Sequence, residues 1–275
     1  MKKYISIIFL LLTVVGCTSS HKNAKRQITV SIEPLRYFTE QIVGNKFKVN
    51  TMVPNGGNPE TYEPTAQQMV DLSNSNLYIK VGHIGFERIW MKKLIQNAPR
   101  IIVVDTSIGI NPCSSNHHPV DPHTWMSTTS ALQIAKNIYK AILQIDVKDS
   151  AFYKRNLVQL IKKIELTDRR VRQQLTKCHP SSFLIYHPTL TYFARDYQLL
   201  QIPIEKDGRE PSASQLQQII QLARGKQVKT LFVQKEFAMR NTQIISSTLH
   251  ISPVEINPLS YHWDEEMLYI AKKIR

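Results

Sequence analysis

The chain has 275 residues and a net charge of +14 at pH 7, from 35 lysines and arginines against 21 aspartates and glutamates. Its length allows two medium domains or one large one. A basic chain invites a nucleic-acid interpretation, but the export signal described next argues against a nucleic-acid partner. Attraction to anionic lipid headgroups is the better physical use of this charge.

The N-terminus has the pattern of an export signal. Two lysines supply positive charge, and residues 5–15 form an apolar run too short to span a membrane. The run leads into Cys17, in a setting that resembles the lipobox of bacterial lipoproteins. We therefore expect residues 1–16 to be a signal peptide, Cys17 to carry the lipid anchor and residues 17–26 to be a tether. The alternative is an ordinary secretory signal with an incidental cysteine. Loss of the signal leaves 259 of the 275 residues and lowers the charge from +14 to +12, because it holds two lysines and no acid.

Short strands and helices alternate over the first half of the chain. The β-branched residues over 27–32 predict a buried first strand. A loop rich in proline and glycine comes before Thr65 and Gln68, which have the spacing of a capping box at a helix start. Strands that alternate with helices predict parallel α/β layers. The other elements expected here are a helix over 37–43, a strand over 47–53, and strands over 77–81 and 101–105 with a helix over 90–95 between them.

The segment Asp121–Trp125 is predicted to be a stiff loop that fixes the direction of a histidine. Pro122 restricts its own backbone and that of the residue before it, and Ser127 is a plausible N-cap for a helix over 130–138. An imidazole at His123, braced by proline and a large indole ring, has the character of a metal ligand. The alternative is a partly buried loop histidine bonded to backbone.

The pattern of apolar and charged residues over 149–177 predicts one long helix, which divides the chain into two parts. Apolar side chains at helical spacing hold one of its faces and charges hold the others. At about 1.5 Å per residue it is roughly 40 Å long, enough to cross a whole domain. The chain is therefore expected to form an N-terminal lobe over 27–148 and a C-terminal lobe over 178–275.

The alternation of strands and helices starts again after the long helix. Ser212 and Gln215 again have capping-box spacing, just after a Glu-Pro pair. The expected fold is thus α/β, with two parallel-sheet lobes joined by one long rigid helix. The elements predicted in this half are strands over 183–186, 199–204, 230–233 and 253–256, and helices over 190–197, from 212, over 242–249 and over 264–274.

Several polar residues fall just beyond the carboxyl ends of the predicted strands. Ligands bind at such ends in parallel sheets, which places a site in the cleft between the two lobes. His187 directly follows an apolar strand and precedes a proline, so it is a second candidate ligand; the alternative is a structural histidine that caps the next helix. The residues at strand ends are Glu60, His123, His187, Gln234, Glu236 and Asn257.

The chain as a whole resembles the metal-binding lipoproteins that feed zinc and manganese ABC importers. The resemblance runs over residues 27–274 and lies in the order and spacing of several motifs rather than in any one. It implies the same fold of two α/β lobes joined by one rigid helix. The motifs are Gly57–Pro64, Asp121–Trp125, His187-Pro188 with Tyr192–Ala194, Glu210–Ser212 and Asn257–Leu259.

The resemblance implies four ligand positions, and this chain departs from the family pattern at two. The first is usually a histidine and is Glu60 here; the second and third are His123 and His187. The last is commonly an aspartate or absent, and the matching Asn257 is a poor zinc ligand. Members associated with manganese usually have a carboxylate at the third position, so His187 favours zinc.

The donor types also favour zinc. Two neutral imidazoles and one carboxylate suit Zn²⁺, with a fourth position open, whereas Mn²⁺ prefers more oxygen donors and stands at the weak end of the affinity order. Mn²⁺ or Fe²⁺ is the runner-up. Glu60 could point outward while Glu63 or Glu236 serves instead, so the carboxylate remains open.

Two further features have no fixed role. Zinc members of the family often have a long histidine-rich loop before the Asp-Pro-His motif; here only His117 and His118 remain, as a surface loop or an auxiliary metal site. Export permits a disulfide between Cys113 and Cys178, but the sequence cannot place them within bridging range.

The leading hypothesis is a lipid-anchored, extracytoplasmic, monomeric protein that captures zinc and hands it to an ABC permease, without any enzymatic reaction. A zinc hydrolase is the alternative from another class, since two histidines, a glutamate and an open position also describe catalytic zinc. The chain lacks a compact His-Glu-x-x-His motif. An adhesin is a third interpretation, which nothing in the sequence favours. A long helix is a stiff connection, so small lobe closure is expected.

Overall fold

The computed structural model describes residues 26–114, 120–178, 181–205, 208–234 and 240–275. The expected signal peptide, the expected lipidation site Cys17 and nearly all of the tether lie outside the described residues. So do three of the candidate metal-site residues, His117, His118 and Glu236.

Two parallel four-stranded sheets form the two lobes, as the sequence predicted. The N-terminal sheet has the strand order β2-β1-β3-β4 and the C-terminal sheet the order β6-β5-β7-β8, with every pairing parallel. In each lobe the second strand lies on one side of the first strand and the third and fourth strands lie on its other side. The chain therefore changes direction across the sheet next to the first strand, which creates a crevice at the carboxyl ends of the strands. The strands are β1 (Arg26–Ile32), β2 (Phe47–Val53), β3 (Ser75–Lys80), β4 (Ile102–Asp105), β5 (Ser182–Ile185), β6 (Leu200–Pro203), β7 (Leu231–Gln234) and β8 (Pro253–Ile256).

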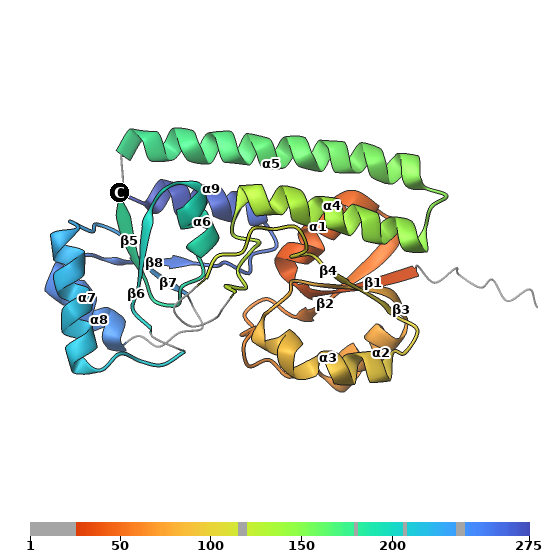
Figure 1. The fold of residues 1–275 in the computed structure, drawn as a ribbon, viewed down its shortest axis with the longest axis horizontal. Helices are drawn as coiled ribbons and strands as arrows, with labels where there is room; N and C mark the ends of the chain where they lie inside the picture. The colour runs from red at the N-terminus through yellow and green to blue at the C-terminus, as the bar shows by residue number, and fades with distance from the viewer. Residues whose placement is uncertain (1–25, 115–119, 179–180, 206–207, 235–239) are drawn as a thin grey trace, which may run out of the picture.

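Helices cover both faces of each sheet. In the N-terminal lobe, α2 and α3 lie on one face, and α1 and α4 lie on the other with α5 behind them (Figure 1). In the C-terminal lobe, α7 and α8 lie away from α5, whereas α9 packs along it. The helices are α1 (Glu33–Val43), α2 (Ala66–Ser73), α3 (Gly85–Asn97), α4 (Thr128–Ile145), α5 (Ser150–Cys178), α6 (Thr191–Asp196), α7 (Ala213–Gly225), α8 (Arg240–Leu249) and α9 (Trp263–Lys273).

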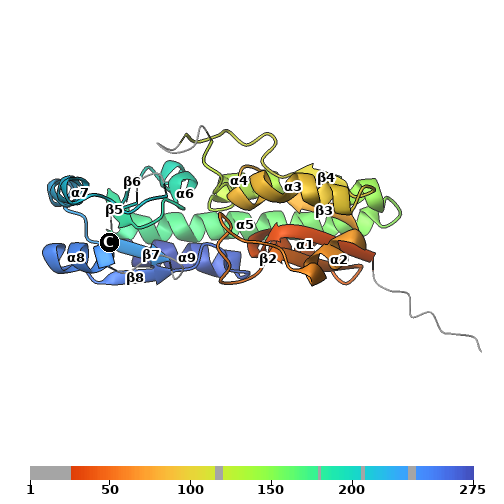
Figure 2. The same ribbon diagram turned by 90° about the horizontal axis from the view of Figure 1, so that it is seen from below.

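The long helix α5 runs along both lobes (Figures 1 and 2). Its buried side chains recur every three or four residues, from Tyr153 through Leu160 and Ile164 to Leu175. This spacing aligns them in one stripe along the helix. The stripe joins a single hydrophobic core that contains residues of both lobes, while a smaller second core lies within the C-terminal lobe.

The sequence predicted capping boxes at two helix starts and a serine N-cap at a third, and the structure has all three. Thr65 of α2 and Ser212 of α7 each form a complete capping box, and the hydroxyl of Ser127 accepts from the amide of Ser130 at the start of α4. The helix expected over 37–43 instead begins at Glu33, because Pro34 fits the first turn of a helix, where no N–H is needed.

Two tryptophans tie the lobes together next to the predicted site. The indole of Trp125 donates to the carbonyl of Pro258 at 2.8 Å, and the indole of Trp263 donates to the carbonyl of Trp125 at 2.6 Å. Trp263 also lies 5.0 Å, between ring centroids, from Phe38 of α1. Both indoles are buried, so the direction of the Asp121–Trp125 loop is fixed from the C-terminal lobe.

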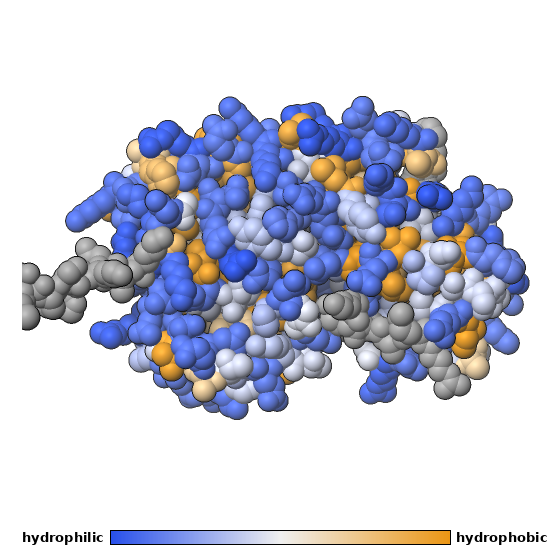
Figure 3. Space-filling view, turned by 180° about the vertical axis from the view of Figure 1, so that it is seen from behind, coloured by the Kyte–Doolittle hydropathy of each residue, from blue (hydrophilic) through white to orange (hydrophobic). Residues whose placement is uncertain are grey.

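Charged and polar groups dominate the back face of the molecule, with apolar residues scattered among them (Figure 3). Within the part of the chain that the structure describes, none of the helices combines the length and the apolar character that crossing a bilayer requires.

A buried carboxyl lies under the start of α3. Glu87 is 3% exposed and accepts from the Ser31 hydroxyl at 2.5 Å and from the amides of Val81 and Gly82 at 2.7 and 2.8 Å. Burial raises the pKa of Glu87 from 4.5 to about 7, against the lowering effect of these hydrogen bonds and of Lys80. The folded state therefore takes up this proton more readily than the unfolded chain does.

We expect Glu87 to make stability fall as the pH rises. Because its folded pKa lies above the unfolded value, its stabilising contribution is complete below pH 4.5 and is lost as the pH rises through 7. The loss is on the order of 3 kcal/mol at 1.4 kcal/mol per unit of pKa. Urea unfolding of the metal-free wild type and of Glu87→Gln, each at pH 4.5 and pH 8, measures this loss. The free energy of unfolding of the wild type, relative to that of Glu87→Gln, should be smaller at pH 8 than at pH 4.5. Glu255→Gln, at an exposed position, is the control. An unchanged difference would contradict the prediction.

Candidate metal centre

A small cavity of about 30 Å³ lies between the two lobes. It has room for an ion or a water molecule but not for an organic ligand. Both lobes contribute to its wall through loops that follow strands or precede helices. The residues that line it are Asn58, Pro59, Glu60, His123, Trp125, His187, Thr189, Gln234, Pro258 and Leu259.

His123 is held by the aspartate that precedes it by two residues. Asp121 Oδ1 accepts from both the backbone amide and Nδ1 of His123, each at 2.9 Å, while Thr191 donates to Oδ2 at 2.8 Å. The hydroxyl of Tyr192 donates to the carbonyl of Asp121 at 2.8 Å. Burial would raise the pKa of Asp121, but the His123 imidazole and these hydrogen bonds outweigh it and keep the pKa below its usual value. Asp121 therefore remains a carboxylate.

His187 has an equivalent arrangement in the C-terminal lobe. Its Nδ1 lies 3.1 Å from Oε1 of Glu205, a buried carboxyl just after β6. The amide group of Gln234 donates to the His187 carbonyl at 2.7 Å and to Thr189 at 3.0 Å, and its oxygen accepts from the His187 amide at 3.3 Å. Because β5 and β7 are neighbours at the point where the strand order reverses, Gln234 and His187 meet there.

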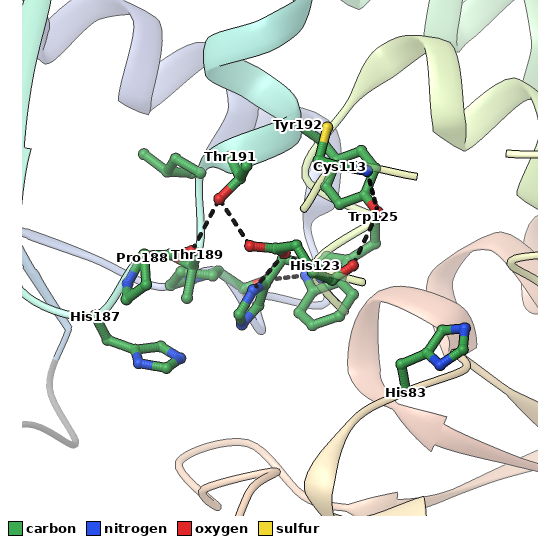
Figure 4. Close-up of polar contacts among 12 residues, drawn as sticks. His83, Cys113, His123, Trp125, His187, Pro188, Thr189, Thr191 and Tyr192 are labelled. Carbon is green, nitrogen blue, oxygen red and sulfur yellow. Dashed lines mark hydrogen bonds and ion pairs between the residues drawn. The ribbon is translucent and has the colours of Figure 1, made fainter. Parts of the chain in front are cut away.

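The two imidazoles stand together at the cavity. Their ring centroids are 5.3 Å apart and the rings are nearly perpendicular, at 77° (Figure 4). A carboxylate oxygen lies within hydrogen-bond distance of Nδ1 of each ring. With Nδ1–H as the donor to that oxygen, the lone pair of each neutral ring is on Nε2. This carboxylate–histidine pairing is the usual way in which proteins orient metal-binding imidazoles. His83 stands apart from both rings in Figure 4.

Glu60 lines the same cavity from the N-terminal lobe, but one of its oxygens has a protein partner. Oε2 accepts from the amide of Gly85 at 3.0 Å and lies 3.5 Å from Arg88 Nη2. In the described part of the chain, Oε1 makes no hydrogen bond. Across the same residues, no three His, Cys, Asp or Glu side chains are already gathered around one point. The structure thus presents two neighbouring imidazoles and a carboxylate in the wall of one cavity.

Glu63 and Asn257 are not among the described residues that line the cavity. Glu63 is exposed to solvent. Asn257 is close to the site, but its amide group donates to Asn55 at 3.4 Å and its oxygen accepts from the amide of Leu259 at 3.1 Å. Cys113 and Cys178 are both free thiols.

Sequence reasoning missed the two carboxylates that orient the imidazoles. Asp121 was noted only as part of the Asp-Pro-His motif, and Glu205 was not singled out. Glu205 follows the predicted strand over 199–204, so the rule that selected the other residues at strand ends could also have found it. Its partner, 18 residues earlier in the chain, could not have been identified without the fold.

Comparisons with known proteins agree with this fold. A family described as zinc-uptake complex component A, periplasmic (ZnuA) matches residues 28–272. The chain is 24% identical to the high-affinity zinc uptake system protein ZnuA of Bacillus subtilis, over 93% of this chain and 86% of that one. It is 25% identical to the manganese ABC transporter substrate-binding lipoprotein PsaA of Streptococcus anginosus, over 91% and 88%. A crystal structure of ZnuA superposes with a TM-score of 0.87 at 33% identity, covering 91% of this chain and 98% of that one.

Proposed function

Because this chain belongs to the ZnuA family of non-enzymatic, metal-binding solute-binding proteins of zinc and manganese ABC importers, we propose that its own ion is Zn²⁺. It captures zinc outside the cytoplasm and delivers it to the permease of an ABC transporter. Zinc is the cargo of the protein. Family membership also sets the hydrolase alternative aside.

One observation carries the choice of zinc. Nδ1 of His123 and Nδ1 of His187 each lie within hydrogen-bond distance of a carboxylate oxygen. The centroids of the two imidazole rings are 5.3 Å apart, and both residues line one cavity. Two oriented neutral imidazoles suit zinc, with Glu60 as an oxygen donor and a fourth position for water. We propose these three residues as the ligands. Asn257 and the exposed Glu63 remain outside this ligand set.

Manganese or iron is the second candidate ion. The relative from Streptococcus anginosus is named for manganese and is as similar to this chain as the Bacillus zinc protein. A manganese site gains from additional oxygen donors, and Glu205 has an oxygen 3.1 Å from Nδ1 of His187. Its contact with Nδ1 gives Glu205 a role in orienting the imidazole instead.

The remaining proposals concern the location and division of the chain. We propose that residues 1–16 are removed, that Cys17 carries a lipid anchor and that residues 17–26 tether the folded part to the membrane. We propose an N-terminal lobe over 27–148 and a C-terminal lobe over 178–275, on either side of a linking helix over 149–177. The relatives named as lipoproteins support the anchor.

We expect protein purified without added metal to contain about one zinc per chain and little manganese or iron. Mass spectrometry of the metal content is the measurement, because the protein then reports the ion that it acquired in the cell. Affinity alone does not decide the question, since zinc binds more tightly than manganese at most nitrogen-containing sites, and copper more tightly still. Manganese or iron as the dominant metal would contradict the choice of zinc.

A further inference from the structure

Glu60 stands at the position where the resembling family usually has a histidine, and the first turn of α3 holds its carboxylate. We propose that Gly85 positions Glu60 as a one-oxygen ligand and that Arg88, on the same helix, competes with the ion for that carboxylate. The two residues thereby set the affinity of the site in opposite directions. This inference rests on the proposed function, because it takes Glu60 as a ligand.

The start of α3 lacks a cap of its own. Ile84 is the N-cap residue and offers no side-chain acceptor, so the first amides of the helix need acceptors from elsewhere. The amide of Phe86 donates to the carbonyl of Pro59 at 2.8 Å, and that of Gly85 donates to Glu60 Oε2 at 3.0 Å. The partial positive charge at a helix start also favours a carboxylate there. A loop 25 residues earlier in the chain therefore supplies the cap, and the cap is a candidate ligand.

Only glycine permits this approach. A Cβ atom on residue 85 would meet Glu60 Oε2 first, and would also lie 2.7 Å from the carbonyl oxygen of Glu60 and 2.9 Å from its Cα atom. The last two are backbone atoms, so an alanine at this position must displace the loop, and rotation of the Glu60 side chain is not enough. Gly85 thus fixes how deeply Glu60 enters the cavity wall.

The two oxygens of Glu60 have different surroundings. Oε2 accepts a hydrogen bond from the Gly85 amide. Oε1 has no hydrogen-bond partner among the residues that the structure describes. Glu60 lines the cavity that also contains His123 and His187. One oxygen is therefore anchored, and the other would be the one left to bind an ion.

Arg88 adds a competing positive charge. Its Nη1 donates to the carbonyl of His83 at 2.6 Å, which holds Nη2 at 3.5 Å from Glu60 Oε2. The guanidinium reduces the negative charge that Glu60 offers to a divalent cation in the cavity. The Arg88 side chain is 49% exposed and solvent screens it, so its effect on affinity is modest.

Zinc affinities of the full-length variants, measured by competition with a chromogenic chelator, test the inference. We expect Gly85→Ala to weaken zinc binding about ten- to a hundredfold, as displaced ligand supports do. We expect Arg88→Gln to tighten it about two- to fivefold, the range of an exposed ion pair. Both effects should vanish in a Glu60→Gln background, because each acts through that carboxylate.

Two matched variants control for general effects. Gly225→Ala adds a methyl group in open space at the end of α7, and Arg155→Gln removes one positive charge from the exposed face of α5. Neither should change zinc affinity. Thermal unfolding without metal shows whether Gly85→Ala has lost its fold, and Arg88→Gln tests the inference independently.

The outcomes separate this inference from the proposed function. If either effect persists in the Glu60→Gln background, or if Arg88→Gln weakens binding, the inference is overturned. If Glu60→Gln alone leaves zinc affinity unchanged while loss of the two histidines abolishes it, the inference fails and the proposed histidine site stands. If loss of the two histidines has no effect, the proposed function fails first.

Discussion

Replacing both His123 and His187 by alanine is expected to weaken zinc binding by at least about a thousandfold. Changes to residues that only support metal ligands cost about ten- to a hundredfold, and this variant removes two of the three proposed ligands themselves. Glu60 would then remain alone, with one oxygen already bound to Gly85. Isothermal titration of metal-free wild type and the double variant with zinc, in the presence of a competing chelator, measures the difference.

The control for that experiment is a histidine away from the cavity. His262 is exposed, precedes α9 and does not line the cavity, so His262→Ala should bind zinc as the wild type does. Unchanged affinity in the double variant would show that zinc binds elsewhere in the chain.

Zinc binding should also weaken between pH 7.5 and pH 5.5 in the wild type, because protons compete with the ion for imidazole nitrogens.

Replacing Trp125 by alanine should have the largest effect on stability. The indole is 1% exposed, its N–H donates to Pro258 and its own carbonyl accepts from Trp263. Truncating a buried tryptophan costs about 3–5 kcal/mol through the cavity that it leaves. The variant also loses the ring beside His123, whose centroid is 5.3 Å away, so zinc binding should weaken together with stability.

Two variants help to interpret the loss at Trp125. Trp90→Ala removes the same side chain from α3, where it is only partly buried and stacks under Lys93, and should cost much less. Trp125→Phe keeps an aromatic ring but leaves the Pro258 carbonyl without its indole donor, which should cost about 1–3 kcal/mol. Chemical denaturation without metal measures all three. Equal losses at positions 90 and 125 would contradict the structural role given to Trp125.

Local patterns were sufficient to predict the fold. The strand over 27–32 is rich in β-branched residues, the strand over 183–186 is a run of apolar residues, and the long helix has a stripe of apolar residues at helical spacing. Each of these signals lies within one segment of the chain. The boundaries were less certain where a residue fits two roles. Pro34 can end a strand or open a helix, and α1 shows that it opens one.

The candidate site was harder to predict because its contacts join distant segments. His123 and His187 could be selected since each follows or precedes a proline at the edge of a predicted element. The carboxylate on His187 and the amide on Glu60 come from Glu205 and Gly85, which no local pattern connects to them. A glycine at a helix start is ambiguous in sequence, and only the close approach of another chain segment reveals why it is there.

The continuous core beneath α5 has a consequence for how the ion is taken up and released. The core includes Phe38 of the N-terminal lobe and Met267 of the C-terminal lobe, and Tyr261 donates to Glu40 across the same junction at 2.6 Å. Separating the lobes would expose apolar surface, at about 25 cal/mol for each Å². Capture of an ion therefore proceeds with little change in heat capacity, since little apolar area changes its contact with water.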